Sequence, residues 1–237
     1  MLIGQGVPID AIECNWQFKE ALVKIRNVTI FATLVWLLTF SNIVKAETVS
    51  VGGTDAWLYV PSNPKASLIL LPGQGGLSKT DPLQRAAEDY STQGFAVLAV
   101  DSRTNIIPAM KYLSKVAKPV YLAAVSAGVS RVASMMKNGK LRTQGLVLIS
   151  GNLKLLQRSA KGPHKLPRTL VIHHRDDACE KTPPGEVNNF KEWGGSKVTV
   201  HWLDGGSNRG NACGPMSHHG LAGLDDQVVS AIANFLE

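Results

Sequence analysis

One serine lies where an uninterrupted apolar segment meets a segment of helical period. The apolar residues, 120–125, are typical of a buried strand, Ser126 follows them, and the helical pattern begins directly afterwards. A serine on such a turn is exposed and can attack a carbonyl carbon. Close packing of the strand against the helix requires small residues two positions before and after it, where the sequence has Ala124 and Gly128. The alternative interpretation is an ordinary serine that caps a helix N-terminus.

A serine hydroxyl becomes a useful nucleophile only when a base takes its proton and a third group orients that base. Two later segments carry suitable residues. Asp176 and Asp177 follow a predicted strand, and His218 and His219 precede a predicted C-terminal helix. The chain order of serine, aspartate and histidine therefore favours a catalytic triad, with both members of each pair open at this point.

The elements that must position these residues alternate along residues 54–237. Several of the apolar segments lack polar alternation, as expected for strands buried on both faces of a parallel sheet. The pattern predicts an α/β fold with a mostly parallel central sheet and helices on both faces, formed by one domain over residues 47–237. Strands are expected at 56–60, 67–71, 95–100, 120–124, 146–149, 170–173 and 198–202, and helices at 83–90, 107–117, 127–136, 186–193 and 225–236.

Together these motifs resemble the α/β-hydrolase family, specifically a small member without a sizeable cap domain, over residues 54–237. The family's acid often follows a strand in the pattern V-H-G-x-x-D, and the segment I-H-H-R-D-D places Asp177 at that position. Its histidine commonly precedes glycine, as His219 does here. The segment A-V-S-A-G departs from the family's G-x-S-x-G at its first residue, where alanine replaces glycine.

The resemblance implies a serine hydrolase that acts on a small-molecule ester-type substrate and needs no cofactor. It implies Ser126 as the nucleophile, His219 as the general base and Asp177 as the acid, with Asp176 and His218 as alternatives. An amidase or a thioesterase could use the same residues. A non-catalytic binding protein on this scaffold is a further alternative, because a fold does not dictate a function.

A glycine-rich turn, residues 72–76, follows an early predicted strand. It is similar to the H-G-G-G segment of lipases and esterases, with Pro72 in place of the histidine. The resemblance implies that the backbone N–H groups of Gln74 and Ala127 form the oxyanion hole. A flexible turn is the alternative. A phosphate-binding loop is disfavoured, because the turn lacks G-K-[ST] and a helix directly after it.

A cluster of potential metal ligands surrounds the predicted acid. Adjacent residues on a strand point to opposite faces, so His173 and His174 are poorly placed to bind one ion. The sequence also lacks a C-x-x-C or H-E-x-x-H companion. We therefore expect no metal site among these residues, which are His173, His174, Asp176, Asp177 and Cys179.

The first 46 residues have the pattern of a leader with a signal peptide. The apolar core spans residues 28–40, which is too short to cross a bilayer, and the small residues Val44 and Ala46 predict cleavage after Ala46. The mature protein is then expected to be exported, to a bacterial periplasm or the medium, without a stable membrane anchor. A retained anchor and a buried helix over residues 16–40 are the alternatives. Residues 1–22 have no assigned role.

Export would change the cysteine count. The chain has three cysteines, and Cys14 would leave with the leader. The remaining pair, Cys179 and Cys213, flanks the predicted acid and base and would lie in an oxidising compartment. We expect a disulfide between them that ties the acid loop to the histidine loop. Two free thiols are the alternative.

The chain is basic, with a formal net charge of +7, but only 6% of its residues are aromatic. A basic segment, 154–168, contains no acidic residue. No aromatic residue interleaves with its charges, so binding of nucleic acid is not expected. The segment is interpreted as a solvated loop, with attraction of anionic substrates or of a membrane surface as alternatives. Nothing in the sequence assigns an oligomeric state.

Overall fold

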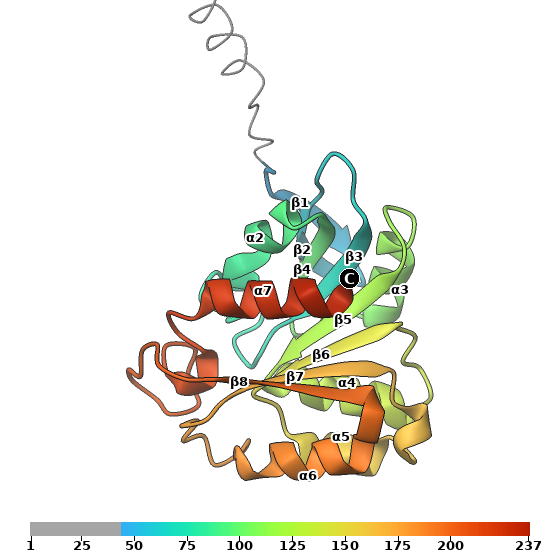
Figure 1. Cartoon of the computed structure of the whole chain (residues 1–237). Helices are drawn as coiled ribbons and strands as arrows, with labels where there is room; N and C mark the ends of the chain where they lie inside the picture. Colours follow the sequence, from blue (N-terminus) through green and yellow to red (C-terminus); the bar gives the residue numbers. More distant parts are fainter. Residues whose placement is uncertain (1–43) are drawn as a thin grey trace, which may run out of the picture. The chain divides into compact units, whose positions relative to one another are not determined.

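The computed structural model describes residues 44–237, whose strands form one eight-stranded sheet in the order β1-β2-β4-β3-β5-β6-β7-β8 (Figure 1). The strands are β1 (Glu47–Val51), β2 (Thr54–Tyr59), β3 (Ala66–Leu71), β4 (Phe95–Val100), β5 (Val120–Val125), β6 (Gly145–Ile149), β7 (Arg168–His174) and β8 (Val198–Leu203). The helices are α2 (Ala87–Thr92), α3 (Ile106–Leu113), α4 (Ala127–Lys137), α5 (Leu153–Ser159), α6 (Gly185–Gly194) and α7 (Asp225–Leu236), with short 3-10 turns η1 (Gln84–Ala86), η2 (Pro163–Lys165), η3 (Gly195–Lys197) and η4 (His218–Gly220).

The sheet is mostly parallel, as the sequence predicts. Strands β4, β3, β5, β6, β7 and β8 all run in one direction, while β2 lies antiparallel to both β1 and β4. The carboxyl ends of the parallel strands therefore lie along the same edge of the sheet. Loops that leave this edge can bring residues far apart in the sequence into one site.

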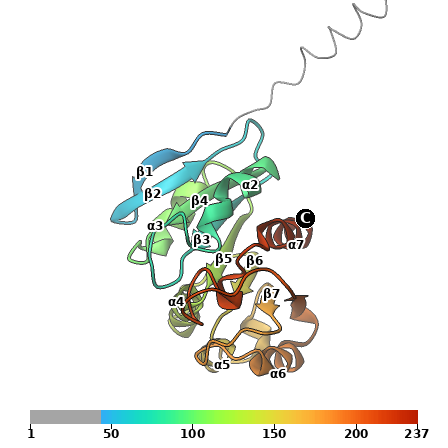
Figure 2. The ribbon, with the colours of Figure 1, turned by 90° about the vertical axis from the view of Figure 1, so that its left-hand side faces the viewer.

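Helices cover both faces of the sheet, which confirms the second part of the prediction. Side chains alternate along β3, so Ile69 and Leu71 pack with α3, α4, α5 and α6, whereas Leu68 and Leu70 pack with α2 and α7. Figure 2 shows α2 and α7 on one side of the sheet and α3 and α4 on the other. The two cores fix the strand ends from both sides, so the loops that follow them start from rigid positions.

Strand β1 is missing from the sequence-based prediction. It pairs with β2 through a hairpin in which Gly52 and Gly53 both have positive φ, +64° and +88°. A Gly-Gly pair between two short segments of strand-forming residues is a recognised hairpin signal. The apolar pattern here is weak, because β1 is a largely exposed edge strand with few apolar residues.

Helix α5 corrects the interpretation of the basic segment 154–168 as a solvated loop. Asn152 caps this helix by accepting a hydrogen bond from the Leu155 N–H at 2.9 Å. Leu153 and Leu156 are buried one turn apart, while Lys154 is exposed. The connection from β6 to β7 thus contains α5 and η2, and the basic residues of α5, Lys154 and Arg158, lie on the exposed face of an amphipathic helix.

The predicted signal-peptide core, residues 28–40, and residues 1–22 lie outside the described part of the chain. The first strand begins at Glu47, the residue after the predicted cleavage site. Within residues 44–237, none of the helices combines the length and the hydropathy that crossing a membrane requires.

Candidate active site

Ser126 lies on a strained turn between β5 and α4. Its backbone has φ of 51° and ψ of −114°, a conformation that costs a non-glycine residue about 1–3 kcal/mol. Its side chain makes no capping hydrogen bond with the helix, which contradicts the interpretation of Ser126 as an ordinary N-cap. Gly128 is required nearby, because a Cβ there would lie 2.8 Å from the carbonyl oxygens of both Leu71 and Pro72.

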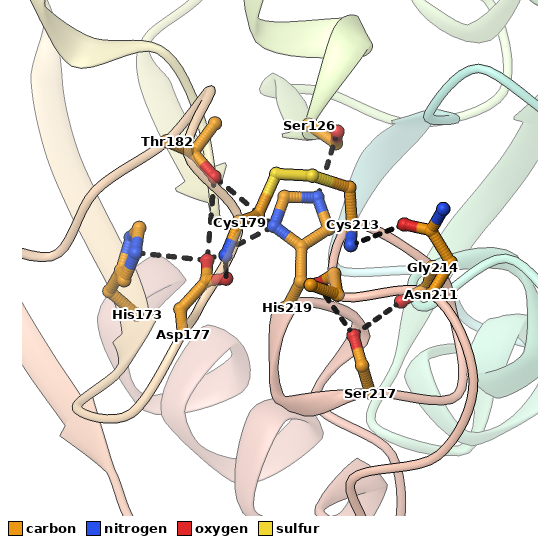
Figure 3. Close-up of a disulfide and its surroundings, with 11 residues drawn as sticks. Ser126, His173, Asp177, Cys179, Thr182, Asn211, Cys213, Gly214, Ser217 and His219 are labelled. Carbon is orange, nitrogen blue, oxygen red and sulfur yellow. Dashed lines mark hydrogen bonds and ion pairs between the residues drawn. A yellow bond between two sulfur atoms is a disulfide. The ribbon is translucent and has the colours of Figure 1, made fainter.

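The structure brings His219 and Asp177 into line with Ser126 (Figure 3). His219 Nε2 lies 2.9 Å from Ser126 Oγ, and His219 Nδ1 lies 3.0 Å from Asp177 Oδ2. A carboxylate can only accept a hydrogen bond, so Asp177 fixes the proton on Nδ1 and leaves Nε2 to accept the serine proton. The three side chains come from the loops after β5, β7 and β8, at the carboxyl edge of the sheet.

Several hydrogen-bond donors around Asp177 favour its ionised form. Burial of its side chain opposes ionisation, but contacts from His173 and His219 and the Cys179 N–H, which donates to Oδ1 at 2.9 Å, outweigh it. The result is a pKa well below the usual value for aspartate. The carboxylate can therefore balance a positive charge on the imidazole when His219 takes a proton.

Two further residues contact this carboxylate, and sequence reasoning assigned neither of them to the site. Thr182 Oγ1 lies 3.4 Å from Asp177 Oδ2, to which it donates, and 3.1 Å from His219 Nδ1. His173 is fully buried and its Nε2 lies 3.2 Å from Asp177 Oδ2, an ion-pair distance without the geometry of a regular hydrogen bond. Nothing in the sequence points to Thr182, and His173 enters the sequence analysis only as one of the potential metal ligands.

The glycine-rich turn after β3 is fixed to the site by Asp81. The Gly73 N–H donates to Asp81 Oδ2 at 2.9 Å, and the Leu83 and Gln84 N–H groups donate to Oδ1. Burial raises the pKa of Asp81, although these N–H groups favour its ionised form. The N–H groups of Gln74 and Ala127 donate to no other residue in the described part of the chain, so both are free to hold a ligand oxygen.

Arg85 binds the loop that carries His219. Its guanidinium donates to the carbonyl oxygens of Pro215, Gly220 and Leu221 at 3.0–3.2 Å, and pairs with Asp225 at 2.6 Å. These carbonyl groups flank His219 on both sides. One short segment around η1 thus anchors both the glycine-rich turn, through its aspartate, and the histidine loop. The Asp-Pro sequence at 81–82 is a helix-start signal that could have located this segment.

A disulfide joins the acid loop to the histidine loop, as the sequence predicts. Cys179 and Cys213 are bonded with their Cα atoms 4.7 Å apart. Cys179 is also the residue whose N–H donates to Asp177 (Figure 3). In the histidine loop, Ser217 Oγ donates to the carbonyl oxygens of Ala212 and Gly214, so the loop is braced internally as well.

Removal of the disulfide should therefore destabilise the protein and weaken the site. For the Cys179→Ala/Cys213→Ala variant we expect the free energy of unfolding to fall by about 3–4 kcal/mol, since the bond closes a long loop. Urea unfolding followed by circular dichroism measures this change. Thiol counting on the wild type under denaturing, non-reducing conditions is the control. An unchanged unfolding midpoint with an unchanged m-value would contradict a stabilising role.

The alternative acid and base lie outside the hydrogen-bonded series. Asp176 is exposed, and the ring of His218 stacks on that of His174 with centroids 3.9 Å apart. The potential ligand atoms of His174, Asp176 and His218 lie within 4.8 Å of one another. However, His174 Nδ1 accepts from the Asp176 N–H and Nε2 lies 2.9 Å from the Gly205 oxygen. Both ring nitrogens of His174 are thus engaged in hydrogen bonds, which leaves this ring no free lone pair for an ion.

A cavity of about 560 Å³ opens above Ser126 and His219. Its walls come from the glycine-rich turn, the start of α4, the start of α5 and the two loops joined by the disulfide. A nucleophile, a base and free N–H donors at the end of a cavity form an arrangement that can add a hydroxyl group to a carbonyl carbon.

Comparison by sequence finds no matching family model and no matching curated protein. Solved structures do match. Est1E from Butyrivibrio proteoclasticus is 15% identical, with 81% of this chain and 97% of that one covered and a TM-score of 0.59. An esterase from Pyrococcus furiosus is 13% identical, with 81% and 91% covered and a TM-score of 0.60. A putative α/β-hydrolase from Agrobacterium tumefaciens is 14% identical, with 81% and 94% covered and a TM-score of 0.60.

At such identities the likeness establishes the fold alone. The protein has the α/β-hydrolase fold, with the mostly parallel sheet and the two helical layers expected from its sequence.

Proposed function

We propose that this protein is an exported serine hydrolase that cleaves an ester-type carbonyl bond through an acyl-enzyme on Ser126. The observation that carries the proposal is the series of hydrogen bonds from Ser126 through His219 to Asp177 at the end of a cavity. The strained backbone of Ser126 adds support, since such strain concentrates at functional residues.

In this proposal His219 Nε2 removes the proton of Ser126 as its Oγ bonds to the substrate carbonyl carbon. The N–H groups of Gln74 and Ala127 stabilise the negative oxygen of the tetrahedral intermediate. His219 then gives the proton to the leaving alcohol, and the acyl group stays on Ser126. A water molecule, deprotonated by His219, attacks the acyl-enzyme and releases the acid, which restores the free hydroxyl.

An ester-type substrate is favoured over other carbonyl compounds by the solved structures of the same fold. One of them is described as an esterase, and a second structure of Est1E contains ferulic acid. Amides and thioesters react through the same steps, so rates on matched ester, amide and thioester substrates decide among them.

Export is supported by two independent features. The leader pattern ends at Ala46, directly before the first strand, and Cys179 is bonded to Cys213. Stable disulfides are typical of proteins outside the reducing cytosol. Sequencing the N-terminus of the protein recovered from the periplasm or the medium tests the export: Glu47 is the expected first residue.

An alkyl fluorophosphonate probe tests the proposed chemistry directly. The probe should label the protein stoichiometrically, and tandem mass spectrometry should place the label on Ser126 and not on Ser130, which lies one helical turn further along α4. Labelling should stop after heat denaturation, because the reaction depends on the folded site. Absence of labelling in a sample with a native circular dichroism spectrum would favour a non-catalytic binding protein.

A further inference from the structure

The cavity above Ser126 is lined without a single large apolar side chain among the described residues. No leucine, isoleucine, methionine, phenylalanine, tyrosine or tryptophan contributes to its wall. The largest apolar groups there are Pro82, Val125, Pro215 and the disulfide, and most of the remaining wall consists of residues with polar or charged side chains. Hydrophobic ligands are usually held by aromatic and branched aliphatic side chains. The wall therefore offers little to a long acyl chain or an aromatic ring.

Several neutral polar side chains line the cavity, and three of them come from three different elements. Gln74 comes from the glycine-rich turn, Ser130 from α4 and Asn152 from the start of α5. The Oδ1 atom of Asn152 caps α5, which leaves its amide N–H groups free. The side chains of Gln74 and Ser130 make no hydrogen bond with another residue of the described region 44–237. Donors and acceptors are thus available on three sides of the nucleophile.

The charges at the cavity do not favour an ionic substrate. Lys181 is exposed and next to Glu180, so charges of opposite sign lie side by side on the rim. Asp81 is buried and already accepts hydrogen bonds from three backbone N–H groups. Substrate groups that fit this wall are neutral and make several hydrogen bonds. An apolar chain would strip water from the polar side chains without replacing its hydrogen bonds.

From this lining we propose that the site takes short-acyl esters of a neutral polyhydroxylated alcohol, such as an acetylated sugar. The inference rests on the proposed function and adds the substrate class to it. The hydroxyl groups of such an alcohol would pair with Gln74, Ser130 and Asn152, while the small acyl group needs no apolar pocket.

A matched panel of esters tests both halves of the proposal. We expect kcat/KM to be at least about tenfold lower for 4-nitrophenyl octanoate than for 4-nitrophenyl acetate, since the cavity wall has no large apolar side chains to bind the extra methylene groups. We also expect kcat/KM to be at least about tenfold higher for an acetylated methyl glucoside than for cyclohexyl acetate, because only the sugar can satisfy the polar groups. Preference for the octanoate, a feruloyl ester or cyclohexyl acetate would overturn the substrate class.

The two proposals fail in different ways. A protein whose Ser126 is labelled by the fluorophosphonate but which prefers the octanoate refutes the substrate class and keeps the serine hydrolase. A folded protein that is not labelled and hydrolyses no ester refutes both.

Two leucine variants on one helix sharpen the test. Ser130→Leu places a branched apolar side chain at the cavity and should lower kcat/KM for the acetylated methyl glucoside by about tenfold. It should also reduce the difference in kcat/KM between 4-nitrophenyl acetate and 4-nitrophenyl octanoate. Ser134→Leu makes the same change one turn further along α4, at an exposed position outside the cavity, and should change neither value. If both variants melt at the wild-type temperature and Ser130→Leu leaves the substrate preference unchanged, Ser130 does not line the functional site and the proposal fails.

Discussion

Replacement of Ser126 with alanine is expected to lower kcat for 4-nitrophenyl acetate by at least about 10⁴-fold, because no other group can form the acyl-enzyme. The hydroxyl that lies 2.9 Å from His219 Nε2 is then absent, and in the proposed mechanism only direct attack by water remains. Steady-state kinetics measure the loss. The circular dichroism spectrum should be unchanged, since Ser126 Oγ makes no bond that caps the helix.

The same kinetic measurement on two histidine variants identifies the base. His219→Ala should cause a loss of similar size, whereas His218→Ala, which removes the ring stacked on His174, should retain activity within about threefold of the wild type. Unchanged hydrolysis by Ser126→Ala would refute the assignment of the nucleophile. A larger loss in His218→Ala than in His219→Ala would move the base to the neighbouring histidine.

Replacement of Asp177 with asparagine should lower kcat by about 10³- to 10⁴-fold, because the carboxylate no longer imposes the productive tautomer on His219. An amide can donate to Nδ1, which would place the histidine proton on Nε2, opposite Ser126. The matched control is Asp176→Asn, one residue earlier and exposed, for which we expect a change within about twofold. Steady-state kinetics with both variants decide between the two aspartates, and a larger loss in Asp176→Asn would reassign the acid.

The Asp177→Asn variant also has a signature in stability. The pKa of Asp177 is lower in the folded protein than in the unfolded chain, where the pKa of aspartate is about 3.9. The ionised group therefore stabilises the fold above that pH, and this contribution is lost as the pH falls below it. The difference in unfolding free energy between wild type and variant should shrink between pH 5 and about 2, as measured by urea unfolding. A difference that stays constant with pH would contradict the lowered pKa.

The elements that carry the site could be predicted from local sequence. The apolar segment before Ser126, the small residues beside it and the helical pattern after it required a tight strand-to-helix turn. The structure adds the physical reason for Gly128: any Cβ at this position would lie 2.8 Å from two backbone carbonyl oxygens. The sequence does not predict β1 and α5. Both are short elements with exposed polar residues, so neither shows a clear apolar periodicity.

Local sequence could not decide which aspartate faces which histidine. Asp176 and Asp177 are neighbours of the same type, and only the path of the loop after β7 turns one carboxylate inward and leaves the other in water. Likewise, the contacts from Thr182 and Arg85 to the histidine loop join residues 37 or more positions apart. Such contacts depend on the packing of separate loops at one sheet edge and leave no periodic signal in the chain.

The sequence by itself determined the fold class and the position of the strand-to-helix turn at Ser126, because both follow from local periodicity and residue size. It predicted the pairing of Cys179 with Cys213 only through the expected loss of Cys14 with the leader. Only the tertiary structure decided the geometry that makes these residues a candidate site. The Ser126 to His219 contact spans 93 residues, and its 2.9 Å length is set by two helical layers, a disulfide and the anchors at Asp81 and Arg85 acting together. Such precision requires a rigid surrounding structure, since a shift of about 1 Å at a reacting group costs about 10²-fold in rate.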